Sequence, residues 1–342
     1  MERTALAVVG CGFFAQNHLH AWMDLAPKGV EIVAVCDIDE AKARATADKF
    51  GVKHWYTDAE TLFREHKLDL VDIVTRVETH RDVVGQAIRR RVPTIVQKPF
   101  GPDLAACRAM ADEAQKAGVF LAVHENFRFQ VPMRKITELL RAGAIGTPSW
   151  GRVSFRTGYD IYKGQPYLAK EERFVLIDLG VHVLDLARVL LGEVEHLSAE
   201  LQRRNPNVSG EDTATMLLKH RSGAVSIVEC TYESRRMPDL FPETLLEIEG
   251  PKGAIILKPG SVLDVTIEGK TTTHDVDAPV LRWAERPWHI IQESVLATCE
   301  HILGALRAGR PADTSALDNV RTFGLVEASY EAASSGRSVR FA

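Results

Sequence analysis

The sequence lacks several features that would assign it to a specialised class of protein. No apolar run is long enough to cross a bilayer, so a membrane protein is not expected. The formal net charge is only -4, which leaves no broad basic surface, and we expect no nucleic-acid partner. Glu2 and Arg3 lead directly into an apolar run without a cleavage site, so no signal peptide is expected.

Cysteine is scarce and shows no framework for disulfides. The five cysteines are odd in number and widely spaced in mostly apolar surroundings, at Cys11, Cys36, Cys107, Cys230 and Cys299. This pattern predicts buried, reduced thiols and a cytoplasmic protein. No group of histidine, cysteine, aspartate and glutamate has the spacing of metal ligands, so no metal is expected.

Two patterns of hydrophobicity divide the 342 residues. In the first, short runs rich in valine and isoleucine alternate with helix-like segments, which is typical of a parallel sheet covered on both faces. From about residue 148, longer alternating runs such as 212–234 predict a largely antiparallel sheet, with Ser222-Gly223 as a hairpin turn. The predicted fold class is therefore α/β, with a doubly wound domain over 1–125 and an α+β domain over 126–342.

The segment GCGFFA, residues 10–15, follows the first predicted strand and opens a helix. Gly10 allows a tight turn, Gly12 lets the backbone approach a pyrophosphate, and Ala15 replaces the usual third glycine. Asp37 ends the second predicted strand, where a carboxylate can bind ribose hydroxyls and repel a 2′-phosphate. We therefore expect a dinucleotide site that prefers NAD to NADP. The alternative is a structural turn and an aspartate that merely caps the next helix.

Lys98 stands in VQKPF at the carboxyl end of a predicted parallel strand. Ligands of open α/β sheets bind outside this edge. The ammonium could donate to a substrate hydroxyl, stabilise developing negative charge, or lower the pKa of a neighbouring acid. A surface lysine with no catalytic role is the alternative.

The segment DLGVHVLD places Asp178, His182 and Asp185 along one face of a predicted helix that begins near Gly180. Histidine is the usual acceptor of an alcohol proton near neutral pH, and a carboxylate in reach can orient the substrate or the ring. The alternatives are a helix cap at Asp178, a buried structural imidazole at His182, and a structural partner for Asp185. For Asp185 the structural alternative is favoured.

The order and separation of these three motifs resemble the glucose-fructose oxidoreductase, inositol dehydrogenase and MocA (Gfo/Idh/MocA) family, from Leu6 to about Phe341. The resemblance implies an N-terminal Rossmann domain and a C-terminal domain whose open sheet often mediates dimers or tetramers, so we expect a homodimer or homotetramer. It also implies that Lys98, Asp178 and His182 are catalytic. His182 would be the general base and the other two would bind the reacting hydroxyl, with Lys98 as the alternative base.

Two departures from the family pattern affect local cofactor contacts, not the class of cofactor. Gln97 stands where the family commonly has glutamate, and Thr75-Arg76 stands where many members have Thr-Pro. Besides the glycine turn and Asp37, the residues expected at the cofactor are Phe13, Phe14, Thr75, His80, Gln97 and Lys98. For the two phenylalanines, packing is an equally good explanation.

The family works mostly on sugars, polyols and their derivatives. The loop 157–167 mixes tyrosines with polar groups, a composition suited to a polyol. The residues expected to bind the substrate are Lys98, Asn126, Arg128, Tyr159, Asp178 and His182. The segment 282–290, with Trp283, Trp288 and His289, is a further candidate, although packing is favoured for each aromatic residue taken singly.

The resemblance favours members that oxidise an aldopentose at C1 to the lactone, with D-apiose or L-arabinose as candidate substrates. The alternatives are an inositol or polyol dehydrogenase, an NAD-bound sensor without redox turnover, and a glycosidase that uses redox only transiently.

Overall fold

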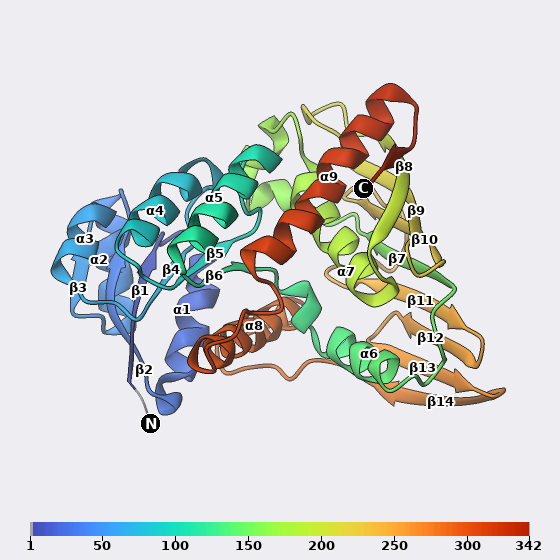
Figure 1. The fold of residues 1–342 in the computed structure, drawn as a ribbon, viewed down its shortest axis with the longest axis horizontal. Helices are drawn as coiled ribbons and strands as arrows, with labels where there is room; N and C mark the ends of the chain where they lie inside the picture. The colour runs from blue at the N-terminus through green and yellow to red at the C-terminus, as the bar shows by residue number, and fades with distance from the viewer. Residues whose placement is uncertain (1–2, 342) are drawn as a thin grey trace. The chain divides into compact units, whose positions relative to one another are not determined.

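The computed structural model describes residues 3–341, which form two compact units (Figure 1). The first unit comprises the residues up to Asn126 together with Ser294–Phe323. The second comprises Phe127–Glu293 and the residues from Gly324 onward. Within residues 3–341, no helix combines the length and the apolar character needed to span a membrane.

The first unit is built on a six-stranded parallel sheet in the order β3-β2-β1-β4-β5-β6. Its order reverses between β1 and β4, so the topological switch point follows β1, where ligands bind in such sheets. The strands are β1 (Thr4–Val9), β2 (Val30–Cys36), β3 (His54–Tyr56), β4 (Leu70–Ile73), β5 (Thr94–Gln97) and β6 (Leu121–His124). All residues of β4, β5 and β6 are buried, which confirms the predicted strands covered on both faces.

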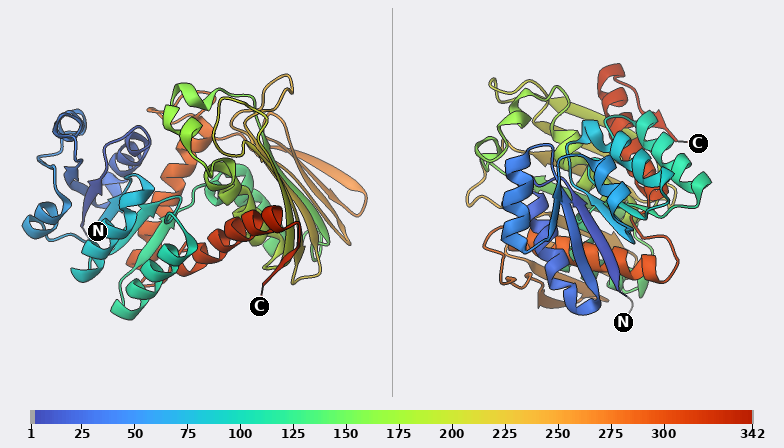
Figure 2. Two further views of the ribbon diagram at one scale, coloured as in Figure 1. Left: turned by 90° about the horizontal axis from the view of Figure 1, so that it is seen from above. Right: turned by 90° about the vertical axis from the view of Figure 1, so that its left-hand side faces the viewer.

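Helices lie on both faces of this sheet (Figure 2). They are α1 (Ala15–Asp24), α2 (Glu40–Phe50), α3 (Ala59–Glu65), α4 (Val77–Arg89) and α5 (Leu104–Ala117), with a short 3-10 turn η1 (Ala26–Lys28). The start of α5 follows the sequence signal, because Asp103 caps it by accepting from the Ala106 amide at 2.7 Å. At its other end Gly118 takes the left-handed conformation, with φ of 64°.

Residues 294–323 pack with the first sheet although they come late in the chain. The Val123 amide donates to the Thr314 carbonyl at 2.8 Å, and Ala122 forms a bridge to Ser315. This pairing explains why part of a segment that we assigned to the second domain belongs to the first unit. The boundary between the units falls within both α8 (His289–Arg307) and α9 (Ala316–Ser335).

The second unit is built on a nine-stranded sheet in the order β14-β13-β12-β11-β7-β10-β9-β8-β15. All neighbours are antiparallel except β7 and β10, so the predicted mostly antiparallel sheet is confirmed. The strands are β7 (Trp150–Arg156), β8 (Val194–Gln202), β9 (Thr213–His220), β10 (Val225–Thr231), β11 (Leu245–Gly250), β12 (Gly253–Lys258), β13 (Val262–Ile267), β14 (Lys270–Asp275) and β15 (Val339–Arg340). The predicted hairpin at Ser222-Gly223 joins β9 to β10.

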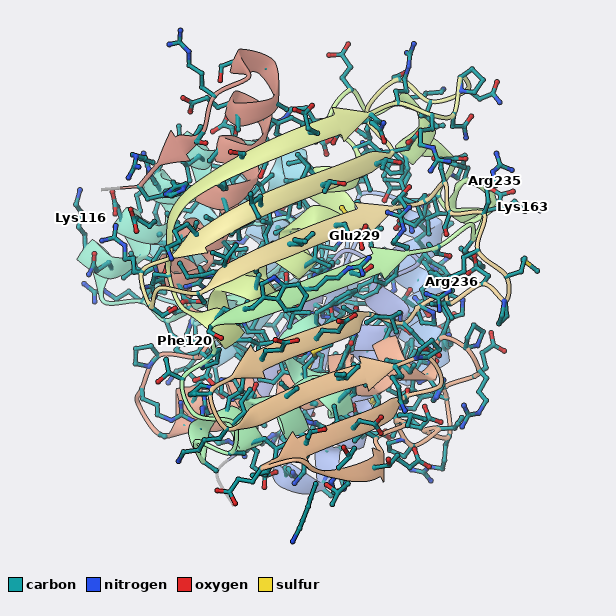
Figure 3. All side chains as sticks on the ribbon, turned by 90° about the vertical axis from the view of Figure 1, so that its right-hand side faces the viewer. Lys116, Phe120, Lys163, Glu229, Arg235 and Arg236 are labelled. Atoms are coloured by element: carbon teal, nitrogen blue, oxygen red, sulfur yellow. The ribbon has the colours of Figure 1, made fainter. Side chains whose placement is uncertain are left out.

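One face of this sheet packs on helix α7 (Val181–Leu191), which lies against β7 and β10. Figure 3 looks onto the opposite face, where Glu229 of β10 lies. There Glu229 forms ion pairs with Arg152 and with Arg156, the latter at 2.8 Å. The remaining helical segments of the unit are η2 (Phe127–Phe129), α6 (Val131–Arg141), η3 (Ile161–Lys163), η4 (Pro166–Lys170) and the π-helix η5 (Leu176–Gly180).

Candidate active site

The glycine turn joins β1 to α1 at the switch point of the first sheet. Gly10 has a φ of 102°, and a Cβ added there would lie 2.5 Å from the Val74 carbonyl oxygen, so only glycine fits. A Cβ added at Gly12 would meet nothing within 4 Å, so the backbone is open on that side. Helix α1 then starts without a side-chain cap. Exposed backbone and the helix N-terminus suit a pyrophosphate, and this part of the chain therefore fits a dinucleotide.

Asp37 is held against the same turn. Its Oδ2 accepts from the Cys11 amide at 2.8 Å, and its Oδ1 accepts from the Asp39 amide at 2.9 Å. These bonds fix the carboxylate beside the turn, as ribose recognition requires. The next residue, Ile38, is 93 % exposed and supplies no cation for a 2′-phosphate. Helix α2 is capped by Asp39, so Asp37 does not have the capping role that was the alternative for it.

His80 ties together the loops that follow β4 and β5. Its two ring nitrogens lie 3.1 Å from the Thr75 carbonyl and 3.2 Å from the Phe100 carbonyl. Burial lowers the pKa of His80 although its bonds to the backbone carbonyls oppose that shift, and a neutral ring donates to one of the two carbonyls at a time. His80 therefore shapes the loop that carries Thr75, and a direct contact of either residue with the cofactor stays a prediction.

The two phenylalanines of the turn differ in their surroundings. Phe13 is 63 % exposed, whereas Phe14 is half-buried with its ring centroid 5.6 Å from that of His18, in an edge-to-face arrangement. Packing thus accounts for Phe14, and Phe13 is the better placed of the two to meet a ligand.

Lys98 follows β5 directly, at the carboxyl edge of the first sheet. Its backbone amide donates to the side-chain oxygen of Gln97 at 2.6 Å. Gln97 is buried, and its amide nitrogen lies 3.3 Å from Nε2 of His18. The side chain of Gln97 thus anchors the backbone of the adjacent Lys98.

The segment with Asp178 and His182 is not one regular helix. Asp178 lies in the π-helix η5, and His182 lies in the first turn of α7. A Cβ at Gly180 would come within 2.8 Å of a methyl group of Leu176, so glycine permits this wide turn. The predicted helix start near Gly180 holds for α7, but the preceding residues form a π-turn, a feature that is frequent at functional sites.

Asp178 is oriented by Tyr232, a residue that sequence reasoning missed. The Tyr232 hydroxyl donates to Asp178 Oδ2 at 2.7 Å, and its ring stacks on Phe174 at 5.5 Å. Burial, and then the charge of Asp178, raise the pKa of Tyr232, so the hydroxyl keeps its proton and remains a donor. The available signal was its place just after β10, at the carboxyl end of a strand.

His182 is buried, and its ring is held face to face with Phe127. The ring centroids are 3.9 Å apart and the planes differ by 4°. Stacking of this kind fixes the plane of the imidazole, because any rotation would open a gap against the phenyl ring. An imidazole with a fixed plane can present its nitrogens in one defined direction, as proton transfer requires.

Two residues expected at the substrate have protein partners. The guanidinium of Arg128 forms an ion pair with Asp185, with its Nη2 2.6 Å from Asp185 Oδ1. Asp185 is fully buried, so this pair agrees with the structural role favoured for it. Asn126 donates through its amide to the Ser294 hydroxyl at 2.7 Å.

Tyr159 belongs to an aromatic cluster that includes a residue the sequence did not suggest. Its ring stacks on Phe241 at 4.0 Å, and Trp288 meets Phe241 edge to face at 4.8 Å. Tyr159 is 38 % exposed, so one part of the cluster faces outward. Apolar ring faces of this kind suit the C–H faces of a sugar.

These features together define a class of protein. The first unit has a glycine turn suited to a dinucleotide with a carboxylate fixed beside it, and the second has a histidine and a carboxylate suited to moving a proton. Together they are typical of a nicotinamide-dependent oxidoreductase.

Comparison with known families agrees with this class. Residues 4–125 match the model of the Gfo/Idh/MocA oxidoreductase family with an NAD-binding Rossmann fold, and residues 133–256 match the family's C-terminal domain. The chain belongs to the Gfo/Idh/MocA family. The predicted Rossmann domain, NAD cofactor and oxidoreductase class are confirmed.

Individual relatives are similar over nearly the whole chain. A D-apiose dehydrogenase of Rhizobium rhizogenes is 48% identical over 97% of this chain and 96% of its own. A D-apiose dehydrogenase of Paraburkholderia graminis is 47% identical over 99% of this chain and 90% of its own. The crystal structure of an oxidoreductase from Agrobacterium radiobacter, in complex with NAD+, L-tartaric acid and magnesium, has a TM-score of 0.97 and 47% identity, covering 99% of this chain and 98% of that one.

Proposed function

We propose that this protein oxidises the C1 hydroxyl of D-apiose to the lactone with NAD+. The observation that carries the proposal is its similarity, at nearly half of all positions and over nearly the whole chain, to two D-apiose dehydrogenases. The reaction removes a hydride from C1 and a proton from its hydroxyl, and it leaves the lactone, NADH and a proton.

The preference for NAD over NADP rests on Asp37. Its carboxylate is fixed beside the glycine turn by the amides of Cys11 and Asp39, so it cannot swing away to make room for a phosphate. A negative group there disfavours a 2′-phosphate and favours free ribose hydroxyls. The contacts of Phe13, Phe14, Thr75, His80 and Gln97 with the cofactor belong to the same proposal.

Three residues act on the reacting hydroxyl. Bound NAD+ supplies the hydride acceptor. His182 takes the hydroxyl proton, Asp178 binds and orients the hydroxyl, and Lys98 keeps a positive charge near the oxygen, which favours an alkoxide-like transition state. Supporting this division, Phe127 fixes the plane of the imidazole and Tyr232 fixes the carboxylate.

The substrate contacts outside this trio follow from the same proposal. Asn126 binds sugar hydroxyls, Tyr159 packs on a C–H face of the sugar, and Arg128 acts near the substrate while paired with Asp185. No metal takes part in the hydride transfer.

The proposed assembly is a homodimer or homotetramer through the outer face of the nine-stranded sheet. On that face Leu217, opposite Ile227 in the β9–β10 pair, is 53 % exposed. If a second copy of the chain covered Leu217, this apolar side chain would be removed from water. The five cysteines are buried and form no disulfide, which supports a reducing compartment, and we propose the cytoplasm.

The test is a comparison of kcat/KM for D-apiose, L-arabinose, D-xylose and myo-inositol, each with NAD+ and with NADP+. The proposal predicts the highest value for D-apiose with NAD+ and formation of the lactone. A higher value for myo-inositol would identify an inositol dehydrogenase instead, and oxidation of none of these compounds would favour an NAD-bound sensor.

A further inference from the structure

A network of hydrogen-bonded, buried side chains leads to the backbone of Lys98 within the first unit. Nδ1 of His18 is 2.8 Å from Oδ2 of Asp72, and the indole of Trp22 donates to the same oxygen at 2.7 Å. Nε2 of His18 is 3.3 Å from the amide nitrogen of Gln97, whose oxygen accepts from the Lys98 backbone at 2.6 Å. His18, Asp72 and Gln97 come from three different elements, α1, β4 and β5, and all three are buried.

The hydrogen-bond partners fix the orientation of the Gln97 amide and decide which nitrogen of His18 carries a proton. The Lys98 amide can only donate, so the oxygen of Gln97 must face it and the NH2 group must face His18. Nε2 of His18 therefore accepts and carries no proton. Asp72 as a carboxylate can only accept, so Nδ1 of His18 carries the proton. A neutral imidazole in a single tautomer satisfies all of these bonds.

The other groups that face His18 allow a neutral ring. The ring of His124, from β6, lies with its centroid 4.1 Å away, and Phe14 meets His18 edge to face. Behind His124, the thiol of Cys299 lies 3.8 Å from Nε2, and burial raises the pKa of Cys299, so the thiol stays protonated. Ligand atoms of His18, His124 and Cys299 lie within 4.8 Å of one another. Both nitrogens of His18 are nevertheless engaged in hydrogen bonds, so we interpret the cluster as a hydrogen-bonded network.

We propose that Gln97 is a positioning residue that ties the backbone of Lys98 to a neutral His18, and that the residue at position 97 decides whether the network holds an extra proton. The positioning part rests on the catalytic role proposed for Lys98. The protonation part depends only on the contacts within the first unit.

Replacement of Gln97 by glutamate changes the hydrogen bonds of this network. Its carboxylate can still accept from the Lys98 amide, but it has no N–H group to offer Nε2 of His18. Two lone pairs would then face each other in a buried site, which is costly unless one proton is added, either to His18 or to the new carboxylate. The pair in Gln97→Glu thus holds one proton more strongly in the folded state than in the unfolded state.

The sign of the pH dependence follows from that proton. A group whose proton affinity is raised by folding stabilises the fold at low pH and loses this contribution as the pH rises. Gln97→Glu should therefore match the wild type at low pH and become less stable at high pH. The apparent unfolding constant of the variant, relative to the wild type, should increase by up to about tenfold per pH unit between the unfolded-state pKa of glutamate, about 4.3, and the folded-state pKa of the pair, and it should level off above the latter.

The experiment measures thermal unfolding and kcat against pH for the wild type, Gln97→Glu and the control Gln115→Glu, which makes the same change on an exposed position of α5. We expect the gap in stability to widen with pH for Gln97→Glu alone, and its kcat with D-apiose to fall at high pH where the wild-type kcat does not. A gap that is constant with pH, or equal in the control, would overturn the proposal.

A second measurement needs neither the variant nor the substrate. In 15N-histidine NMR of the wild type, the signal lost in His18→Asn should show a protonated Nδ1 and an unprotonated Nε2. The opposite tautomer, or a doubly protonated ring, would overturn the proton assignment. Because neither melting nor NMR involves turnover, these results stand apart from any failure of the proposed dehydrogenase activity.

Discussion

Removal of the Tyr232 hydroxyl tests how strongly kcat depends on the orientation of the Asp178 carboxylate. Tyr232→Phe deletes the 2.7 Å bond to Asp178 Oδ2 and keeps the ring stacked on Phe174. A buried hydrogen bond to a charged acceptor contributes about 1.5–3 kcal/mol. If the whole of that energy holds the carboxylate in its working position, kcat falls by about ten- to a hundredfold, since about 1.4 kcal/mol corresponds to a factor of ten.

The assay is NADH formation at saturating D-apiose and NAD+, with the melting temperature measured in parallel. Tyr330→Phe is the matched control, because its hydroxyl donates to Glu211 at 2.6 Å, likewise a carboxylate of the second unit. We expect both variants to lose stability and only Tyr232→Phe to lose kcat to this extent. An unchanged kcat in Tyr232→Phe, or an equal loss in Tyr330→Phe, would refute the orienting role.

Four further predictions concern cofactor choice, proton transfer, metal and pH. Asp37→Ala should lower the ratio of kcat/KM with NAD+ to kcat/KM with NADP+. Equal values of kcat/KM with the two cofactors in the wild type would contradict this role of Asp37. His182→Ala should lower kcat by about 10²–10⁴-fold with NAD affinity nearly unchanged, and the fall of kcat at acid pH should disappear. If Lys98→Met removes that acid limb instead, Lys98 is the base. Chelation should leave activity intact, and recovery of lost activity by zinc or magnesium would show a metal requirement. Burial alone would raise the pKa of Glu229, but the bond and charge of Arg152 lower it, so its carboxylate stabilises the fold at neutral pH and less as pH falls. The melting-temperature gap between wild type and Glu229→Gln should therefore shrink on acidification, and a gap that stays constant would contradict the ion pairing.

The first sheet could be predicted from sequence because its signals are local. The glycine turn, the continuous valine-rich strands and the capping aspartate of α5 each report on a few neighbouring residues. The placement of residues 294–323 could not be predicted in the same way. Its sequence predicts helices whichever unit it belongs to. Only the hydrogen bond between Val123 and Thr314 shows that it packs with the first sheet.

The site shows the same limit. Lys98 and Asp178 stand out by motif, whereas Tyr232 and Phe241 act through partners distant in sequence. The π-turn at 176–180 has no periodicity of its own that would separate it from an α-helix. Arg128 has the chemistry of a substrate contact, but its ion pair with Asp185 arises only when the chain folds.

The central claim is that this chain turns over NAD+ on the C1 hydroxyl of D-apiose, and it is tested most directly by stoichiometry. Limiting D-apiose is incubated with excess NAD+, and free NADH, remaining sugar and lactone are measured together. The account predicts NADH and lactone in equal amounts to the sugar consumed, with their formation slowed about 10²–10⁴-fold in His182→Ala. Sugar consumed without accumulation of NADH would contradict the account and indicate transient redox chemistry instead.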